Sequence, residues 1–144
     1  MNYEIKDAEY SELVDLYEAA DLELNDDRSA PGTVIKNWQV IDESGRQIAG
    51  ASLLEKEGLC VLEDLAVVED LRREGLGKEL LALAIDRAGE EKYEELWLCA
   101  KIPEYYLKFG WEDVDPLTAP PISMCQDCSK FHKSCFPRIM VRKL

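Results

Sequence analysis

Positive charge and bare backbone come together at residues 71–80, LRREGLGKEL, where two arginines are followed by two glycines one residue apart. The apolar spacing that follows predicts a helix from Leu76 to about Glu90. The first N–H groups of a helix have no intrahelical partner, and glycine lets a ligand approach them closely. Because Arg72, Arg73 and Lys78 add full charges there, the stretch predicts a cradle for a phosphate or pyrophosphate group.

The glycines of this stretch, Gly75 and Gly77, also fit a simple tight turn with solvated arginines. The stretch is not a P-loop, because the glycine–lysine–hydroxyl ending of that motif is absent. It also lacks the third glycine of a dinucleotide-binding fingerprint. An anionic ligand outside those two classes is therefore the functional prediction, and the plain turn is its structural alternative.

Hydrophobic spacing predicts the elements that must position this cradle. A first strand around Tyr3 and Ile5 should lead into a helix capped at Asp7, with Leu13, Leu16, Tyr17 and Ala20 on its apolar face. The turn sequences DESG and EKEG predict two hairpins. The further expected elements are strands at residues 38–41, 47–54, 95–100, 111–114 and 138–142, another within 59–70, and a short helix that starts at Pro103 and stops at Gly110.

The order of these elements predicts an α/β (α+β) fold, a mixed central sheet of about six to seven strands with helices on both faces. The helix that starts at Leu76 should make a parallel crossover between two strands. A length of 144 residues is typical of one domain, so we expect a single domain over residues 1–144 with a cysteine-rich insertion at about 115–137.

The net charge of −13, from 17 basic and 30 acidic residues, argues against a nucleic-acid partner, because such binding relies on surplus Lys and Arg. No apolar run approaches the roughly 20 residues that span a bilayer. The N-terminal sequence also lacks the layout of a signal peptide. We therefore expect a cytoplasmic protein that binds neither nucleic acid nor membrane.

The stretch LAVVEDLRREGLGKELL resembles the acetyl-coenzyme A signature of the GNAT superfamily of N-acetyltransferases. Its central Arg/Gln-x-x-Gly-x-Gly/Ala element corresponds to Arg72, Gly75 and Gly77. A second mark of the family, Tyr-x-x-x-Gly-Phe, is matched by Tyr106 and Gly110, with a tryptophan in place of the phenylalanine. The expected order of strands agrees as well, so the resemblance covers nearly the whole chain.

The resemblance implies that acetyl-CoA is the cosubstrate and that two parallel strands splay apart around its pantetheine arm. Main-chain groups of Leu65, Ala66 and Val67 would bind the pantetheine, although Leu65 and Val67 also fit as plain core residues. Amides of the following loop would hold the pyrophosphate. The residues implied for that contact are Arg72, Arg73, Glu74, Gly75, Leu76, Gly77 and Lys78.

The resemblance also implies catalytic roles. Tyr106 lies where the family commonly keeps the tyrosine that protonates the departing sulfur, with packing on a short helix as its alternative. The Leu65 amide is the expected oxyanion donor. For the base, Glu63 is preferred over Asp64, since neighbouring strand residues point to opposite faces. A water relay is the other route, because Cys99 stands where some relatives have a glutamate.

Four metal-ligand types gather near the C-terminus in CQDCSKFHKSC. The Cys-x-x-Cys spacing is a common zinc half-site, so Cys125, Cys128, His132 and Cys135 are candidate ligands. A redox pair or buried thiols are the alternatives. By the family resemblance this insertion overhangs the acceptor site, and it is similar to cysteine-rich tails of some amino-acid acetyltransferases, including N-acetylglutamate synthases.

The leading functional hypothesis is therefore an N-acetyltransferase that moves an acetyl group from acetyl-CoA to the amine of a small molecule, with an amino acid among the candidates. The alternatives are a polyamine or protein acetyltransferase, and a non-catalytic acyl-CoA sensor or metal-binding interaction module on the same scaffold. A homodimer is left open.

Overall fold

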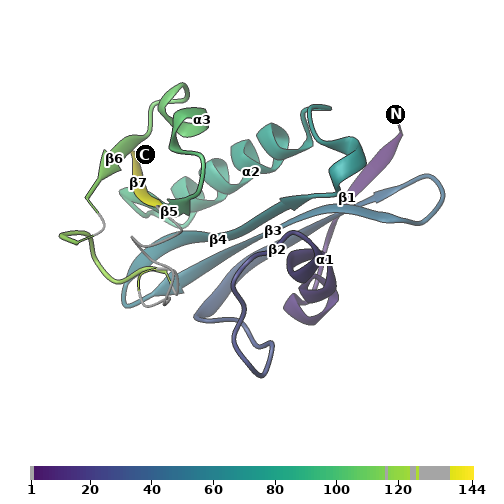
Figure 1. Cartoon of the computed structure of the whole chain (residues 1–144), viewed down its shortest axis with the longest axis horizontal. Coiled ribbons are helices and arrows are strands. Elements are labelled where there is room, and N and C mark those ends of the chain that lie inside the picture. Colours follow the sequence, from purple (N-terminus) through teal and green to yellow (C-terminus); the bar gives the residue numbers. More distant parts are fainter. Residues whose placement is uncertain (1, 116, 124–125, 127–136) are drawn as a thin grey trace.

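One seven-stranded sheet organises the chain in the computed structural model, which describes residues 2–115, 117–123, 126 and 137–144. The spatial order of the strands is β1-β2-β3-β4-β5-β7-β6 (Figure 1). The strands are β1 Tyr3–Asp7, β2 Thr33–Asp42, β3 Gln47–Lys56, β4 Leu59–Val67, β5 Glu95–Ala100, β6 Glu112–Val114 and β7 Arg138–Lys143. The helices are η1 Tyr10–Glu12, α1 Val14–Ala19, η2 Glu69–Leu71, α2 Leu76–Glu90 and α3 Pro103–Leu107, of which η1 and η2 are short 3₁₀ turns.

The first four strands form an antiparallel meander, and the two predicted hairpin turns join β2 to β3 and β3 to β4. The chain then crosses over through α2, so that β5 runs parallel to β4. Strand β7 pairs with β5 and β6 with β7, both antiparallel. The predicted mixed sheet and its crossover are confirmed.

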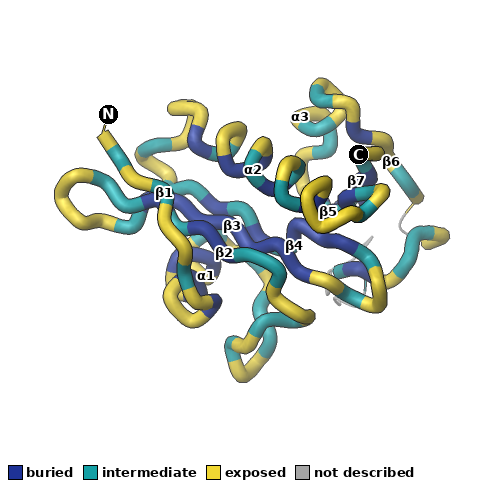
Figure 2. The backbone as a smooth tube through the Cα atoms, turned by 180° about the vertical axis from the view of Figure 1, so that it is seen from behind, coloured by how far each residue is buried: buried dark blue, intermediate teal, exposed yellow. Residues whose placement is uncertain are grey.

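Helices cover both faces of the sheet, as predicted, with α1 on one face and α2 on the other (Figure 1). The buried positions of α2 recur every four residues, at Leu76, Leu80, Ala84 and Ala88, which puts them on one stripe of the helix. Figure 2 shows the buried backbone concentrated in the central strands and in the faces of α1 and α2 turned toward them.

Helix α1 can lie close to the sheet because Gly50 on β3 has no side chain. A Cβ built at Gly50 would stand 2.6 Å from a methyl carbon of Leu13 and 3.1 Å from one of Leu16. Real Cβ atoms do not approach so closely, so any larger residue would push α1 outward. The small residue on β3 therefore sets the distance between α1 and the sheet.

The predicted cap at Asp7 is wrong. Asp7 is the last residue of β1, and its carboxylate pairs with Lys36 on the neighbouring strand. The chain turns instead at Glu9, whose N–H donates to Glu12 Oε1 at 2.9 Å. The continuing strand overrides the local preference of aspartate for a helix start, because its ladder hydrogen bonds with β2 already fix the backbone of Asp7.

Within the described part of the chain, no helix has the length and apolar character needed to cross a membrane.

Candidate active site

The sheet opens between its two parallel strands. Pairing of β4 with β5 is limited to Cys60 with Leu96 and Val61 with Trp97. Beyond these pairs β4 continues to Val67 and β5 to Ala100, each paired on its other side only within the described residues. The predicted splayed pair is therefore present, and main-chain groups that face the gap are released from the ladder.

A cavity of about 370 Å³ lies at this opening. We call it the β4–β5 cavity. Apolar side chains from both strands form much of its wall, and Glu63, Tyr106 and Lys101 are among its polar groups. The lining residues on the strands and on α3 are Leu62, Glu63, Leu65, Leu98, Cys99, Ala100, Tyr105 and Tyr106.

A β-bulge aims Glu63 into this cavity. Ser52 on β3 pairs with Asp64 and the next residue, Leu53, pairs with Leu62, so Glu63 is an extra residue on β4. A bulge of this kind breaks the alternation of side chains along a strand. As a result Leu62 and Glu63 both line the cavity.

The neighbouring carboxylate, Asp64, is directed to the α1 side of the sheet. It is 3% exposed and accepts a hydrogen bond from the Tyr10 hydroxyl at 3.0 Å. Burial, together with the nearby Glu63 charge, raises the pKa of Asp64 to about 7. Of the two candidate bases, the structure thus places Glu63 and not Asp64 at the opening between the strands.

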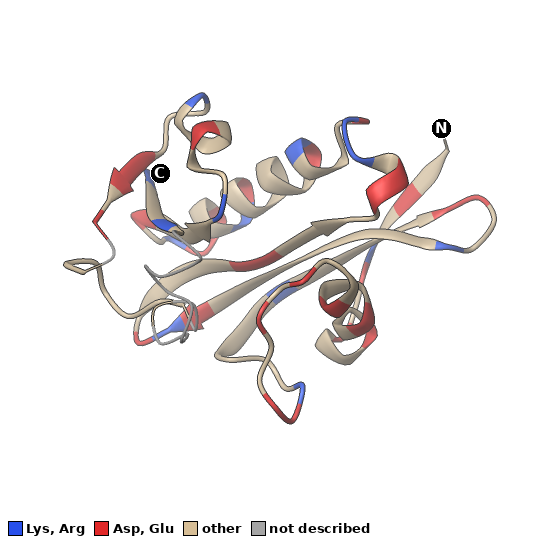
Figure 3. Cartoon of the chain, in the orientation of Figure 1, with Lys and Arg blue, Asp and Glu red and all other residues tan. Residues whose placement is uncertain are grey.

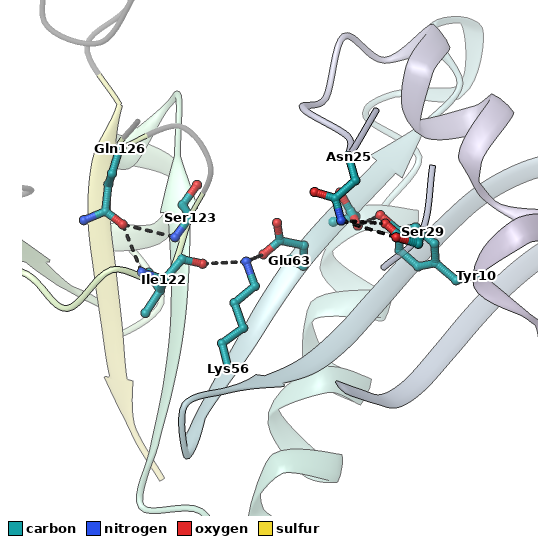
Figure 4. Close-up of polar contacts among 9 residues, drawn as sticks. Tyr10, Asn25, Ser29, Lys56, Glu63, Ile122, Ser123 and Gln126 are labelled. Atoms are coloured by element: carbon teal, nitrogen blue, oxygen red, sulfur yellow. Dashed lines mark hydrogen bonds and ion pairs between the residues drawn. The ribbon is translucent and has the colours of Figure 1, made fainter. Parts of the chain in front are cut away.

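Glu63 is almost completely enclosed and is paired with a lysine (Figure 4). Lys56 Nζ lies 2.5 Å from Glu63 Oε2, and the two side chains are 11% and 7% exposed. Burial raises the pKa of the Glu63 carboxyl, and the adjacent Lys56 ammonium lowers it part of the way back. The result is a carboxylate whose affinity for protons is above that of a solvated glutamate.

Tyr106 reaches the same cavity from α3. Its ring packs edge-on against Trp111, with centroids 5.7 Å apart, and against Tyr105 at 5.2 Å. Burial raises the pKa of the Tyr106 hydroxyl to about 12, so the phenol keeps its proton at neutral pH. The structure therefore brings a buried carboxylate and a protonated phenol to one cavity.

The glycine of the second motif has a packing role that fixes Tyr106. A Cβ at Gly110 would stand 2.6 Å from Nη1 of Arg142 on β7, and the same nitrogen hydrogen-bonds the Phe109 carbonyl. Gly110 also has φ +84°, a conformation that favours glycine, so a larger residue here would strain the backbone and displace the Arg142 side chain. Trp111, 3% exposed, follows at once and supports the Tyr106 ring.

The loop before α2, residues 72–78, has the open backbone that the sequence predicts. Gly75 is the N-cap of α2 and has φ +87°, a conformation that favours glycine. Among the described residues no side chain caps this helix end, so the N–H groups of its first turn face outward. A Cβ at Gly77 would meet only one atom within 4 Å, Val67 Cγ2 at 3.9 Å. We call residues 72–78 the anion loop.

The anion loop carries three basic residues, Arg72, Arg73 and Lys78, and follows the acidic turn η2 (Figure 3). Arg72 Nε donates to the Val67 carbonyl at 3.2 Å, which ties the loop to the end of β4. Arg73 and Glu74 are exposed, and Lys78 Nζ lies 5.7 Å from the centre of the Phe109 ring. Leu76 is buried and can offer only its backbone to a ligand.

The residues predicted to hold pantetheine split between the two faces of β4. Leu65 lines the β4–β5 cavity, whereas Ala66 packs with the hydrophobic cluster around α1. Both side chains contribute to packing, and a ligand in the opening would meet the main chain of this segment. Leu65 and Val67 thus pack against the core, as the structural alternative expects, and the binding of pantetheine by their main chain stays a prediction.

The candidate zinc ligands Cys125, Cys128, His132 and Cys135 lie outside the described residues. In the part of the chain that is described, no group of three or more His, Cys, Asp or Glu side chains could hold a metal ion. Cys60 is a buried thiol whose pKa is raised to about 12 by burial, and Cys99 is a half-buried residue on β5.

Sequence reasoning missed Lys56. No motif contains it, and its EKEG context indicates only a hairpin. Its contact with Glu63 joins the end of β3 to a bulge on β4, and neither a helical nor a strand period predicts a bulge. A lysine at the end of an otherwise buried strand was the one available signal.

The sequence pattern of the acetyltransferase (GNAT) family matches residues 2–111, which is most of the chain. Together with the splayed sheet, this match shows that the chain belongs to the GNAT family, the acetyl-CoA-dependent N-acetyltransferases. A comparison with curated proteins gave no match.

Solved structures with the same fold include N-acetylglutamate synthase from Neisseria gonorrhoeae complexed with coenzyme A and N-acetyl-glutamate. It matches at 18% identity with a TM-score of 0.72, covering 100% of this chain and 35% of that chain. This chain therefore spans about a third of that synthase. The ribosomal-protein-S18-alanine N-acetyltransferase from Escherichia coli matches at 17% identity with a TM-score of 0.71. The match covers 98% of this chain and 93% of that chain.

A GNAT family acetyltransferase from Elizabethkingia anophelis with acetyl-CoA bound matches at 16% identity with a TM-score of 0.63, covering 99% of each chain. At these identities the likeness shows the fold.

Proposed function

We propose that this protein transfers the acetyl group of acetyl-CoA directly to the amine of a small molecule in a ternary complex, with an amino acid as the first candidate. The observation that carries the proposal is the convergence of Glu63 and Tyr106 on one cavity where β4 and β5 separate. A carboxylate and a phenol are suitable as the base and the acid that amide formation from a thioester requires.

The binding of the cosubstrate follows from the backbone. The pyrophosphate of acetyl-CoA binds to N–H groups at the start of α2, where the helix dipole and the arginines of the anion loop favour negative charge. The pantetheine runs along the main chain of Leu65, Ala66 and Val67 toward the cavity. The acetyl group then lies between Glu63 and Tyr106.

The reaction proceeds in balanced steps. Glu63 accepts a proton from the acceptor ammonium, and the free amine nitrogen attacks the thioester carbonyl carbon. The Leu65 amide donates to the oxyanion as the carbon–nitrogen bond forms. The carbon–sulfur bond then breaks, and Tyr106 donates its proton to the departing thiolate. The second proton leaves the new amide nitrogen and restores the Tyr106 phenol, and Glu63 releases its proton to solvent, which leaves the amide and free coenzyme A.

The raised pKa of Glu63 suits this role, because a general base works best when its pKa lies close to the working pH. Tyr106 suits the acid role, because a phenol with a pKa of about 12 is fully protonated when the reaction starts. Tyr106 thus begins the cycle with the proton that the acid role requires.

Two observations suggest the class of acceptor: what a protein with the same fold binds, and which charged residues line the cavity. N-acetylglutamate synthase, which shares the fold, is complexed with N-acetyl-glutamate, and an amino acid is therefore the first candidate. A second candidate is a cationic acceptor such as a polyamine, which is favoured by the two glutamates, Glu23 and Glu63, on the cavity wall. Lys101, on the same wall, favours the carboxylate of an amino acid instead.

The test is thiol release from acetyl-CoA with a panel of amino acids, polyamines and peptide amines. We expect one class of amine to give acetylated product, identified by mass spectrometry, in step with the thiol. Tight binding of coenzyme A with no transfer to any member of the panel would contradict the proposal and favour the sensor alternative.

Zinc at the cysteine cluster, a homodimer and a cytoplasmic location stay predictions. Elemental analysis should find about one zinc per chain if Cys125, Cys128, His132 and Cys135 are ligands.

A further inference from the structure

The Lys56 ammonium lies between the Glu63 carboxylate and the backbone of the segment between β6 and β7 (Figure 4). Besides its 2.5 Å contact with Glu63, Lys56 Nζ donates to the Ile122 carbonyl oxygen at 2.7 Å. Both charged side chains are nearly enclosed, so salt screens the pair only weakly. Loss of the cation would leave the Glu63 charge buried without compensation.

The Ile122 carbonyl, which accepts the hydrogen bond from Lys56, is held in place by its neighbours. Gln126 Oε1 accepts hydrogen bonds from the N–H groups of Ile122 and Ser123, at 3.0 and 3.1 Å (Figure 4). The Ile122 side chain is 1% exposed in a small cluster with Val61 and Ile139. Lys56 is therefore held at its far end by a well-packed turn, which restricts where its ammonium can stand.

Other titratable groups line the same cavity as Glu63 or interact with its charge. They come from the 3₁₀ turn before α1, from the segment after α1, from β4, from β5 and its end, and from α3: Tyr10, Glu23, Asp64, Cys99, Lys101, Tyr105 and Tyr106. The cation of this set, Lys101, donates from its Nζ to the Asp21 carbonyl oxygen at 3.1 Å. Among the described residues, Lys56 is the cation within ion-pair distance of Glu63.

We infer that Lys56 is a positioning residue, whose ammonium keeps Glu63 ionised and aimed into the β4–β5 cavity by anchoring it to the Ile122 carbonyl. This inference rests on the proposed role of Glu63 as the base. Lys56 does not touch the reacting atoms. It sets the pH range over which Glu63 can accept a proton, and it orients the Glu63 carboxylate toward the cavity.

The test separates charge from hydrogen bonding. Lys56→Gln keeps donors for Glu63 and Ile122 but removes the charge, and Lys56→Arg keeps the charge. In Lys56→Gln we expect the midpoint of the Glu63 titration to rise by about one pH unit or more, because an adjacent opposite charge lowers a carboxyl pKa by about that much. Lys56→Arg should restore most of the wild-type midpoint.

Two readouts are needed. The first is carbon-13 NMR of protein labelled at the glutamate carboxyl carbons, with the Glu63 signal assigned by its loss in Glu63→Gln. The second is the pH dependence of kcat/KM with the amine that gives the fastest thiol release. Lys56→Gln should move the acid limb of that profile upward by the same amount as the NMR midpoint.

Lys36→Met is a control variant, because Lys36 lies on the neighbouring strand β2 and pairs with Asp7 outside the cavity. It should change neither readout. Calorimetry with coenzyme A checks that each variant is folded. Lys56→Met, which keeps the length of the apolar stem, is the second charge-free variant if Lys56→Gln fails to bind coenzyme A.

An unchanged Glu63 midpoint in a folded charge-free variant would overturn the inference and leave the proposed reaction intact. If the Glu63 titration midpoint rises but the pH dependence of kcat/KM stays the same, Glu63 is not the base of the reaction. The electrostatic coupling between Lys56 and Glu63 would still be supported. Both shifts together support the inference and the proposed base.

Discussion

The anion loop and the β4–β5 cavity are two halves of one proposed site, and they are assembled in different ways. The loop takes seven consecutive residues, 72–78, and depends on the backbone of one helix start. The cavity gathers Glu63 from β4 and Tyr106 from α3. Lys56 from β3 pairs with Glu63, with the Ile122 carbonyl as an anchor. The loop is thus local and mostly exposed, whereas the groups proposed for catalysis are buried and distant in sequence.

This difference indicates how each half should respond to substitution. Backbone binding tolerates most side-chain changes and is sensitive chiefly to bulk that blocks the approach of a ligand. Buried charged groups depend on their partners, so a single change alters protonation and geometry together. Substitutions in the loop should weaken binding of coenzyme A, and those in the cavity should lower turnover.

The largest effect is expected for Glu63→Gln. Loss of the base should lower turnover by about 10²- to 10⁴-fold, while the affinity for coenzyme A changes little. Thiol-release kinetics and calorimetry measure the two quantities. Glu55→Gln is the matched control, because Glu55 lies on β3 outside the cavity and contacts Tyr93. Equal turnover of wild type and Glu63→Gln would favour the water relay.

Tyr106→Phe should reduce turnover by about 10- to 100-fold, because the coenzyme thiolate would leave without a proton donor. With a pKa of about 12 in the wild type, Tyr106 stays protonated well above neutral pH and should not produce a basic limb near neutrality. Tyr105→Phe, at a 37% exposed neighbour, should be close to wild type. An equal loss in both variants would point to packing of α3 instead.

Gly77→Val should weaken the binding of coenzyme A by about tenfold, or roughly 1.4 kcal/mol, without a matching loss of stability. A Cβ at Gly77 has room in the protein itself, so the expected clash is with the ligand. Gly89→Val places the same side chain in the same helix at a position with nothing within 4 Å. Calorimetry compares the two, and equal affinities would argue that the loop is only a turn.

Asp64→Asn should have the smallest effect on turnover, within about threefold of wild type, because Asp64 faces Tyr10 on the other side of the sheet. The main effect of Asp64→Asn should be on the pH dependence of the free energy of unfolding. The pKa of Asp64 is raised from 3.8 to about 7, so the native state holds a proton that the unfolded chain releases. Stability from this group is therefore present at low pH and is lost as the pH rises from about 4 to about 7.

Asparagine cannot ionise, so the variant should gain stability relative to wild type on going from about pH 5 to about pH 8. The gain should be on the order of 2 kcal/mol in the free energy of unfolding. Urea titrations at the two pH values measure it. A difference between the proteins that does not vary with pH would show that Asp64 titrates like an ordinary carboxyl.

Much of the fold follows from short-range patterns. The bounds of α2 and β5 agree with those predicted, because a four-residue apolar period and a compact apolar run are local signals. The helix start expected at Asp7 is wrong, since pairing of β1 with β2 carries the strand through that residue. Local residue preference sets the end of an element where no neighbouring strand pairs with it. Where a neighbouring strand does pair, that pairing sets the end.

The sequence by itself determined the mixed sheet, the crossover helix and the bare backbone at Gly75 and Gly77, because these depend on residue type and spacing over a few turns. Only the tertiary structure decided which carboxylate faces the cavity, since a bulge on β4 turns Glu63 toward it and leaves Asp64 with Tyr10. The partner of Glu63 was decided in the same way. A bulge and a buried ion pair arise from how strands and loops meet in space, and no period along the chain encodes that meeting.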